Sequence, residues 1–516
     1  MNGSNAGAER GRPAGRGAVL GMRTETVVAL VAIAGLLVPL SALSQPADAR
    51  SAGGRLAQMR AQSGLAQAGL GDVDASGETL RLATLGLKNV AVVLLWDRIN
   101  HYKMVKDWTS LSAALEQMTK LQPHFVSVWK HQAHNLSYNI SVEFDDYRDR
   151  YAWVIKGIEF LRKGTTLNRT EPQLLGEMGW FIGHKIGTAD EKRQFRRLFK
   201  EDEEFHLRDD PARTLPERDN WLVGREKYRA ADALVDAGHP VPNPLVFHNH
   251  VMKWSINHAR ALEAEGTFGS AAGEAWIRAQ QDLAAYASRE IPTSWHVPIR
   301  LALQEEQEAK ARRLEQDLEA LLPGQFAALG RRLQAAIPPA AREAVETPAP
   351  QRTAEQQRLA EEALAAATPT WQQVAREAPA AVRDRAGELV RLHDEARRTA
   401  EIIDRYRDIV NFNFWRACCE AEATAPALLA RERLWQAREA EKKADLQAAR
   451  TAYAEAFAAW RTVLDASPVI RADALSAREM AEEVDRYRRL LDKGFGEQLP
   501  QPFVLQDMLD LAGSER

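Results

Sequence analysis

The sequence predicts an all-α protein made of irregular tetratricopeptide-like helical hairpins, a long helical arm and one N-terminal transmembrane helix. Three observations predict this fold class. Apolar residues recur at intervals of three and four along most of the 516-residue chain. The strong helix formers Ala, Glu, Arg, Leu and Gln dominate from about Leu301 onward. One uncharged apolar run stands near the N-terminus.

Charge balance and cysteine content argue against two classes of protein. The chain has 68 Lys and Arg against 71 Asp and Glu, a formal charge of -3, so no net field attracts nucleic acid. Its two cysteines, Cys418 and Cys419, are adjacent, and neighbouring Cα atoms lie too close for a relaxed disulfide. We interpret both as small, half-buried structural side chains. No cofactor is expected, since no glycine-rich phosphate loop, H-E-x-x-H or C-x-x-C-H sequence occurs.

The N-terminal apolar run is Val27 to Leu43, and it follows a short cytoplasmic or disordered tail, residues 1–26, that is rich in arginine. This pattern is typical of an export signal. The segment either stays as a transmembrane signal anchor, which we favour, or is cleaved at the small-x-small sequence Ala47-Asp48-Ala49. The arginines place the tail in the cytoplasm. The expected location is the cytoplasmic membrane, single-pass, with the bulk of the chain on the extracytoplasmic (periplasmic) side.

A linker over residues 44–79 leads into an N-terminal helical domain, residues 80–300. The run Leu80 to Trp96 carries Arg81 and Lys88, so it predicts a packed helix instead of a second membrane span. Two tetratricopeptide-like hairpins follow, separated by turns with proline. In the first hairpin, one helix presents Trp108, Leu111, Leu115, Met118 and Leu121 and stops at Pro123, and the next presents Trp129, Ala133 and Leu136. In the second hairpin, one helix presents Gly157, Leu161 and Gly164 and ends near Asn168. The helix after Pro172 presents Leu175, Met178, Gly179 and Ile182.

The second half begins with a charged helical arm and a linker, residues 301–350. The arm runs from Leu301 to Ala336 with an interruption at Pro323-Gly324, and Pro338 to Pro350 is predicted as a proline-rich linker. A C-terminal helical domain, residues 351–516, holds the third hairpin. That hairpin turns at Lys443-Ala444-Asp445, ends at Pro468 and presents Ala437, Ala449, Tyr453, Ala456 and Trp460.

The segment Trp129 to Trp153 concentrates aromatic, histidine and acidic residues, and it is the sequence's best candidate for a functional surface. Large rigid side chains carry much of the binding energy in interfaces. The predicted partner-binding residues are therefore Trp129, Tyr138, Tyr147 and Trp153.

No catalytic residue and no metal site are predicted, and only a few residues approach a ligand set. His131 and His134 share a helical face, and Asp145 and Asp146 lie near enough in sequence to join them. His248 and His250 would point the same way from a strand. Glu203 and His206 have the Glu-x-x-His spacing of di-iron bundles, but no second copy occurs.

The blocks Asp107 to Leu161, Gly179 to His206 and Arg218 to Gly224 resemble an uncharacterised family of bacterial membrane-anchored proteins with tetratricopeptide-like hairpins. Automatic labels sometimes attach the phrase "iron responsive element" to that family. The resemblance implies an envelope protein. It does not imply iron, because such an element is an RNA stem-loop and the chain has no iron-sulfur ligand set or basic RNA-binding face.

The expected function is that of a membrane-anchored, non-enzymatic scaffold of the cell envelope, which binds a protein or peptide partner in a helical groove. One alternative is a metal-dependent hydrolase using the His/Asp cluster within residues 131–149. A second alternative is a structural element of the envelope that assembles into a coiled coil through the charged arm. No nucleic-acid partner is expected, and the oligomeric state is left open.

Overall fold

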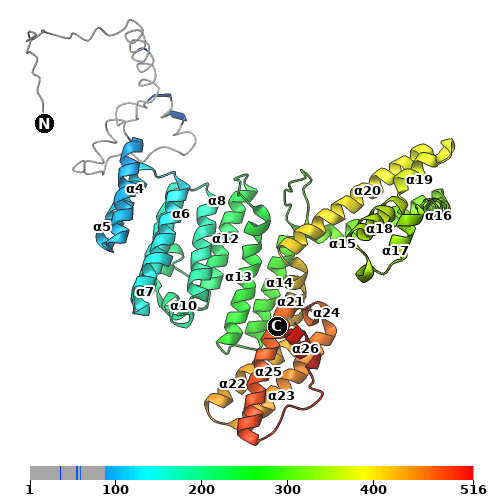
Figure 1. Ribbon diagram of the computed structural model, residues 1–516. Helices are drawn as coiled ribbons and strands as arrows, with labels where there is room; N and C mark the ends of the chain where they lie inside the picture. Colours follow the sequence, from blue (N-terminus) through cyan, green and yellow to red (C-terminus); the bar gives the residue numbers. More distant parts are fainter. Residues whose placement is uncertain (1–34, 36–53, 56–57, 60–87, 515–516) are drawn as a thin grey trace, which may run out of the picture. The chain divides into compact units, whose positions relative to one another are not determined.

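The computed structural model describes residues 35, 54–55, 58–59 and 88–514, and helices make up its regular structure (Figure 1). Within these residues the β pairing consists of one isolated antiparallel bridge, Ile291 to Ile299. The all-α prediction is confirmed. The predicted membrane segment, Val27 to Leu43, lies outside the described residues except for Gly35. No helix in the described part is both long enough and apolar enough to cross a membrane.

The chain divides into two compact units, residues 1–125 and 126–516. In the first unit, α4 (Lys88–Met104) packs against α5 (Trp108–Leu121). The side chain of Asp107 caps α5 by accepting a hydrogen bond from the Ser110 backbone N–H at 3.1 Å. The predicted apolar face of α5 is buried at Leu111, Leu115, Met118 and Leu121. The first predicted hairpin spans the boundary between the two units.

The second unit begins with a series of helices in which helices adjacent in sequence pack against each other. A widened π-helical turn replaces regular helix in two places, η2 and η4. The elements are α6 (Val126–His134), η2 (Asn135–Ile140), η3 (Ser141–Glu143), α7 (Tyr147–Leu167), α8 (Pro172–Trp180), η4 (Phe181–Lys185), α9 (Ile186–Thr188), α10 (Lys192–Glu201), α11 (Glu203–Asp209) and η5 (Pro216–Arg218). As predicted, Asn168 ends α7 and Pro172 occupies the first turn of α8.

Three longer helices continue the stack: α12 (Asn220–Asp236), α13 (Pro244–Ala264) and α14 (Ser270–Ser288). Figure 1 shows them side by side after α8, and each contacts the next. Glycines permit close crossings here. A Cβ at Gly179 would lie 2.8 Å from the Gly224 carbonyl oxygen, so α8 and α12 touch through their backbones.

The predicted arm, Leu301 to Ala336, is part of a larger helical subdomain that continues into residues expected in the C-terminal domain. Its elements are η6 (Leu301–Leu303), α15 (Gln304–Leu321), α16 (Gln325–Ala335), α17 (Pro339–Glu346), η7 (Ala349–Gln351), α18 (Ala354–Ala367), α19 (Trp371–Glu377) and α20 (Ala380–Ile409). The break at Pro323-Gly324 occurs as predicted. The linker prediction for Pro338 to Pro350 was wrong in part, because Pro339 begins α17, where a proline costs no helical hydrogen bond. Leu318 is fully buried in a cluster with α19 and α20, so the arm's apolar stripe is covered within the chain.

The C-terminal helices form one apolar cluster: α21 (Phe412–Glu422), α22 (Ala425–Lys442), α23 (Leu446–Ala466), α24 (Pro468–Arg471), α25 (Ala474–Phe495) and α26 (Gln506–Ser514). The hairpin of α22 and α23 is present, with its turn at Lys443 to Asp445 and Ala444 at a φ of 59°. Ala437, Ala449, Tyr453 and Ala456 are buried where the two helices cross. Whether this hairpin is a tetratricopeptide unit stays a prediction.

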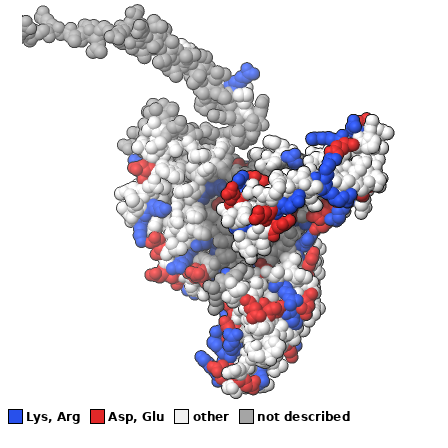
Figure 2. All heavy atoms as spheres, turned by 45° about the vertical axis from the view of Figure 1, so that its right-hand side comes forward, with Lys and Arg blue, Asp and Glu red and all other residues white. Residues whose placement is uncertain are grey.

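Acidic and basic side chains are interspersed on the face of the molecule shown in Figure 2. Several ion pairs of the described residues lie along a single helix, such as those of Arg391 with Glu388 and Glu395 on α20. Such exposed pairs contribute little to stability individually.

Candidate functional site

The four predicted partner-binding aromatics do not line an open groove. Trp129 is 2% exposed and Trp153 is 8% exposed. The indole of Trp129 fills the space over Gly164, where a Cβ would lie 2.9 Å from the ring. Tyr138 and Tyr147 are half-buried. Trp129 and Trp153 are therefore core side chains, and among the four predicted residues only Tyr138 and Tyr147 keep part of their surface exposed.

The acidic residues Asp145 and Asp146 lie directly before α7, and Asp146 caps the start of this helix. Asp146 accepts a hydrogen bond from the Arg148 backbone N–H at 2.7 Å and so begins α7. His131 and His134 are exposed, and the His134 ring stacks on Tyr138 with 4.6 Å between centroids. Asp145 is exposed as well. Across the described residues, no three His, Cys, Asp or Glu side chains gather closely enough to hold a metal ion.

His248 and His250 lie on helix α13, so the expectation of a strand at this point was wrong. Two residues that are two positions apart on a helix differ by about 200° in direction around its axis, so the two imidazole rings point to different sides of α13. His248 Nδ1 lies 2.7 Å from Asp232 Oδ1. His250 stacks on Tyr228 at 4.5 Å, and burial lowers its pKa to about 4. Both histidines serve packing between α12 and α13.

The Glu-x-x-His pair also ends in packing. His206 on α11 is fully buried, with Nε2 at 2.7 Å from the Phe199 carbonyl oxygen, and burial lowers its pKa. Glu203 on the same helix is exposed and pairs with Arg218 at 3.5 Å. The two side chains therefore do not form a joint site.

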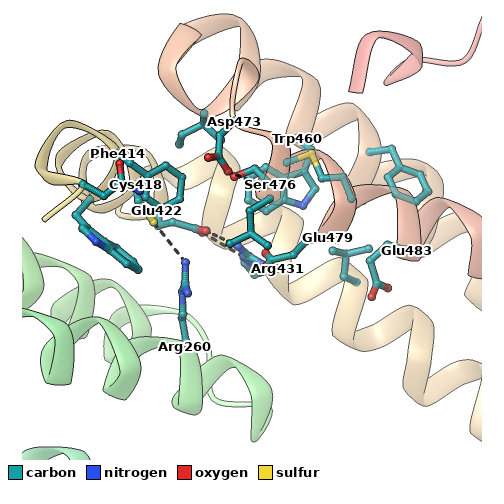
Figure 3. Close-up of a pocket in the computed structure, with 17 residues that line it drawn as sticks. Arg260, Phe414, Cys418, Glu422, Arg431, Trp460, Asp473, Ser476, Glu479 and Glu483 are labelled. Atoms are coloured by element: carbon teal, nitrogen blue, oxygen red, sulfur yellow. Dashed lines mark hydrogen bonds and ion pairs between the residues drawn. The ribbon is translucent and has the colours of Figure 1, made fainter. Parts of the chain in front are cut away.

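A cavity of about 140 Å³ opens between α13, α21, α22 and α25 (Figure 3). Apolar and aromatic side chains supply most of the exposed wall: Phe414, Trp415, Leu434, Trp460 and Met480. Four carboxyl side chains also line it: Glu422, Asp473, Glu479 and Glu483. A dry apolar cavity of about 150 Å³ is large enough to bind benzene. The cavity therefore has room for one aromatic or branched aliphatic group.

An ion pair between a buried glutamate and a half-buried arginine lines this cavity. Glu422, at the end of α21, is 4% exposed and forms two hydrogen bonds with the Arg431 guanidinium of α22. Arg431 also lies over the Trp460 ring, 4.7 Å from its centroid. A second carboxyl group, Glu263 of α13, accepts a hydrogen bond from the Trp276 indole N–H at 2.8 Å. Burial, followed by the charge of Glu422, raises the pKa of Glu263 to about 7.

Arg260 is the cation that reaches into the cavity from α13 (Figure 3). Its Nη2 atom lies 3.7 Å from Cys418 Sγ, and its guanidinium lies 5.7 Å from the Trp415 ring centroid. Among the carboxylates of the described residues, none is within ion-pair distance of Arg260, in contrast to Arg431 beside it. Arg260 is thus a half-buried cation that forms no ion pair among the described residues, in a cavity that has both apolar and carboxyl side chains in its lining.

The adjacent cysteines lie at this same place and are fully buried, not half-buried as expected from the sequence. Burial raises the pKa of Cys418 to about 11 and also raises the pKa of Cys419. Both thiols are protonated at neutral pH and are weak nucleophiles.

The residues of the cavity were missed in the sequence because they come from six helices, α13 and α21 to α25. Arg260 and Met480 are 220 positions apart in the chain. The single local signal was the cysteine pair with its neighbouring aromatics, Phe412 to Trp415.

Comparison with known protein families, curated proteins and solved structures gives no match for this chain. The resemblance to a bacterial membrane-anchored family stays a prediction.

Proposed function

We propose that this chain is a binding protein of the cell envelope that holds a segment of a partner protein through the cavity between α13, α21, α22 and α25. The observation that carries the proposal is the Arg260 guanidinium, which lines the cavity next to the aromatic ring of Trp415 and forms no ion pair among the described residues. A partner that inserts an apolar side chain and places a carboxylate next to Arg260 would satisfy both features.

An aromatic or branched side chain is the most favourable anchor for this cavity. Burying such a side chain completely contributes about 1.5–3 kcal/mol. Phe414, Trp415 and Trp460 offer ring faces and edges with which an aromatic anchor packs well. A hydrogen-bonded ion pair to Arg260 adds orientation, because the guanidinium binds a carboxylate through two parallel N–H groups.

The wider setting of this proposal comes from the sequence. The apolar run Val27 to Leu43 behind arginines supports a membrane anchor, and the side of the arginines supports an extracytoplasmic position for the rest. The hairpin of α22 and α23, with small residues at its crossing, supports a tetratricopeptide-like unit as the framework of the site.

The test uses N-acetylphenylalanine as the probe and the purified full-length chain, with saturation-transfer NMR as the readout. We expect saturation of the ring protons in the wild type and its loss in Met480→Trp, which fills the cavity with a larger side chain. The control Leu429→Trp changes an exposed position on α22 outside the cavity and should bind like the wild type. Equal ring saturation in Met480→Trp and the wild type would refute the proposal.

Arg260 is tested with the amide of the same probe. N-acetylphenylalanine amide lacks the carboxylate and should bind the wild type more weakly than the acid does. In Arg260→Met the acid and the amide should bind alike, because the difference between them depends on the guanidinium. If Arg260→Met still bound the acid more tightly than the amide, the carboxylate of the probe would interact with a cation other than Arg260.

A further inference from the structure

A second hollow of about 820 Å³ lies on the surface between α10, the end of α13, α22 and α25. We call it the basic groove. Seven basic and four acidic residues line it, which gives an excess of three positive charges. One wall is α10 with Arg193, Arg196, Arg197 and Lys200. The groove is therefore electropositive in a chain whose formal charge is -3.

The cations of the basic groove fall into two groups. On one wall Arg196 pairs with Asp219 at 2.9 Å and with Glu265 at 2.7 Å, and across the groove Lys442 pairs with Glu439. Three others have no ion-pair partner among the described residues: Arg193, Arg197 and Lys200 of α10. Arg193 and Arg197 are exposed, and Lys200 is half-buried. These three charges are available to an outside anion.

The groove also contains an aromatic surface. Trp435 of α22 is half-buried there and lies against Gly266, where a Cβ would approach the indole to 2.6 Å. Gly266 also has a φ of +86°, so both the backbone conformation and the close ring require glycine. Trp435 is thereby held in place as a fixed surface along the groove.

The basic groove and the cavity adjoin each other. Arg438 lines the groove and Glu483 lines the cavity, and Arg438 donates to Glu483 at 2.5 and 3.2 Å. One extended segment could therefore occupy both places by passing over this ion pair.

We infer that the basic groove binds an acidic segment of the same partner whose apolar anchor enters the cavity. The placement of the apolar anchor in the cavity rests on the proposed function. The binding of an acidic segment in the groove is supported independently, by the positive charge of the groove. The four carboxylates in the lining disfavour a nucleic-acid strand, because its phosphates repeat at every nucleotide and would meet them. A peptide can place its acidic side chains only where Arg193, Arg197 and Lys200 are free.

The experiment measures fluorescence anisotropy with the full-length chain and a fluorescein-labelled peptide in which a run of glutamates precedes a C-terminal phenylalanine. The variant Arg193→Glu/Arg197→Glu/Lys200→Glu should weaken binding about tenfold or more. Replacing the glutamates of the peptide by glutamines should weaken wild-type binding similarly and remove the effect of the variant. Raising the salt concentration should weaken wild-type binding and leave the triple variant nearly unaffected.

A matched control variant is Lys192→Glu/Arg229→Glu/Lys310→Glu, which reverses three exposed charges outside the groove and the cavity. It should bind like the wild type, and circular dichroism should show both triple variants folded. Unchanged affinity of the groove variant, or equal wild-type affinity for the glutamine peptide, would overturn the inference. Tighter binding of a single-stranded oligonucleotide than of the peptide, lost in the groove variant, would overturn it in favour of nucleic acid.

The peptide also separates the two proposals. Replacing its C-terminal phenylalanine by alanine removes the anchor and leaves the glutamates. Failure of this change to weaken binding would count against the cavity, while a persisting effect of the groove variant on the alanine peptide would still support the groove.

Discussion

Arg438 of α22 and Glu483 of α25 form a two-pronged ion pair, with Nη2 to Oε1 at 2.5 Å and Nε to Oε2 at 3.2 Å. The pair separates an apolar cavity from a basic groove and joins two helices of the C-terminal cluster. The side chain of Arg438 is 40% exposed and that of Glu483 is 13% exposed, so water screens the pair only partly.

The first prediction concerns this ion pair. Arg438→Met leaves Glu483 with one weaker partner, Arg486 at 3.8 Å, and should lower the free energy of unfolding by about 1 kcal/mol. Arg438→Met/Glu483→Met removes both charges and should be more stable than the single variant. Urea denaturation of the two variants and the wild type measures the difference, and equal stability of the single and double variants would show that Glu483 needs no partner.

A second prediction follows from Glu263, whose pKa is raised from 4.5 to about 7. The folded chain keeps the proton over this range while the unfolded chain has lost it, so the free energy of unfolding should fall as the pH rises from about 4.5 to about 7. Glu263→Gln should abolish this contribution and, at pH 8, stabilise the chain by on the order of 2 kcal/mol.

The measurement for Glu263 is the thermal midpoint as a function of pH, followed by circular dichroism. Glu274→Gln serves as the control, because Glu274 is exposed on the neighbouring helix α14 and should leave the pH dependence unchanged. A Glu263→Gln variant with the same pH profile as the wild type would show that Glu263 titrates normally.

Substitution of two helical glycines by alanine should change the free energy of unfolding in opposite directions. At Gly157 of α7 a Cβ would lie 2.0 Å from Ser137 Oγ and 2.8 Å from the Ala133 carbonyl oxygen, so Gly157→Ala should destabilise by about 1–3 kcal/mol. At Gly387 of α20 nothing lies within 4 Å, and Gly387→Ala should stabilise by up to about 1 kcal/mol. Thermal unfolding gives both signs, and stabilisation by Gly157→Ala would contradict the packing of η2 on α7.

The cysteine pair gives a fourth prediction. Because Cys418 and Cys419 are buried with raised pKa values, both should react slowly with a thiol reagent at neutral pH and quickly in urea. In a Cys419→Ala variant, N-acetylphenylalanine should slow the alkylation of Cys418 further, since Cys418 lines the cavity. Mass spectrometry follows the reaction, and fast stoichiometric labelling of the native chain would mean that the site is more open than described.

Much of the helical framework could be predicted because its signals are local. Pro172 at the start of α8 and Pro323-Gly324 between α15 and α16 act through their own backbone. The same local reasoning led to wrong predictions at Pro339 and at the histidines of α13. A proline that begins a helix was interpreted as a linker, and an alternating pair of histidines on a helix was interpreted as part of a strand.

The site itself depends on contacts that sequence periodicity does not specify. The sequence placed Gly164 on a helix face, but it could not show that Trp129 fills the space beside this glycine. Arg260 has the pattern of an ordinary arginine on a helix, and its lack of a carboxylate partner results from the packing of α13 against α21 and α22. Such features emerge only when distant helices are brought together.

The most direct test of the binding proposal is a photo-crosslink. The glutamate-rich peptide is made with p-benzoylphenylalanine at its C-terminus, irradiated with the full-length chain and digested with trypsin. We expect the label on the tryptic peptide that contains Met480, which lines the cavity. Met480→Trp should prevent this labelling, while Leu429→Trp should not. Labelling that falls outside the cavity, or that persists at the same positions in Met480→Trp, would contradict the account.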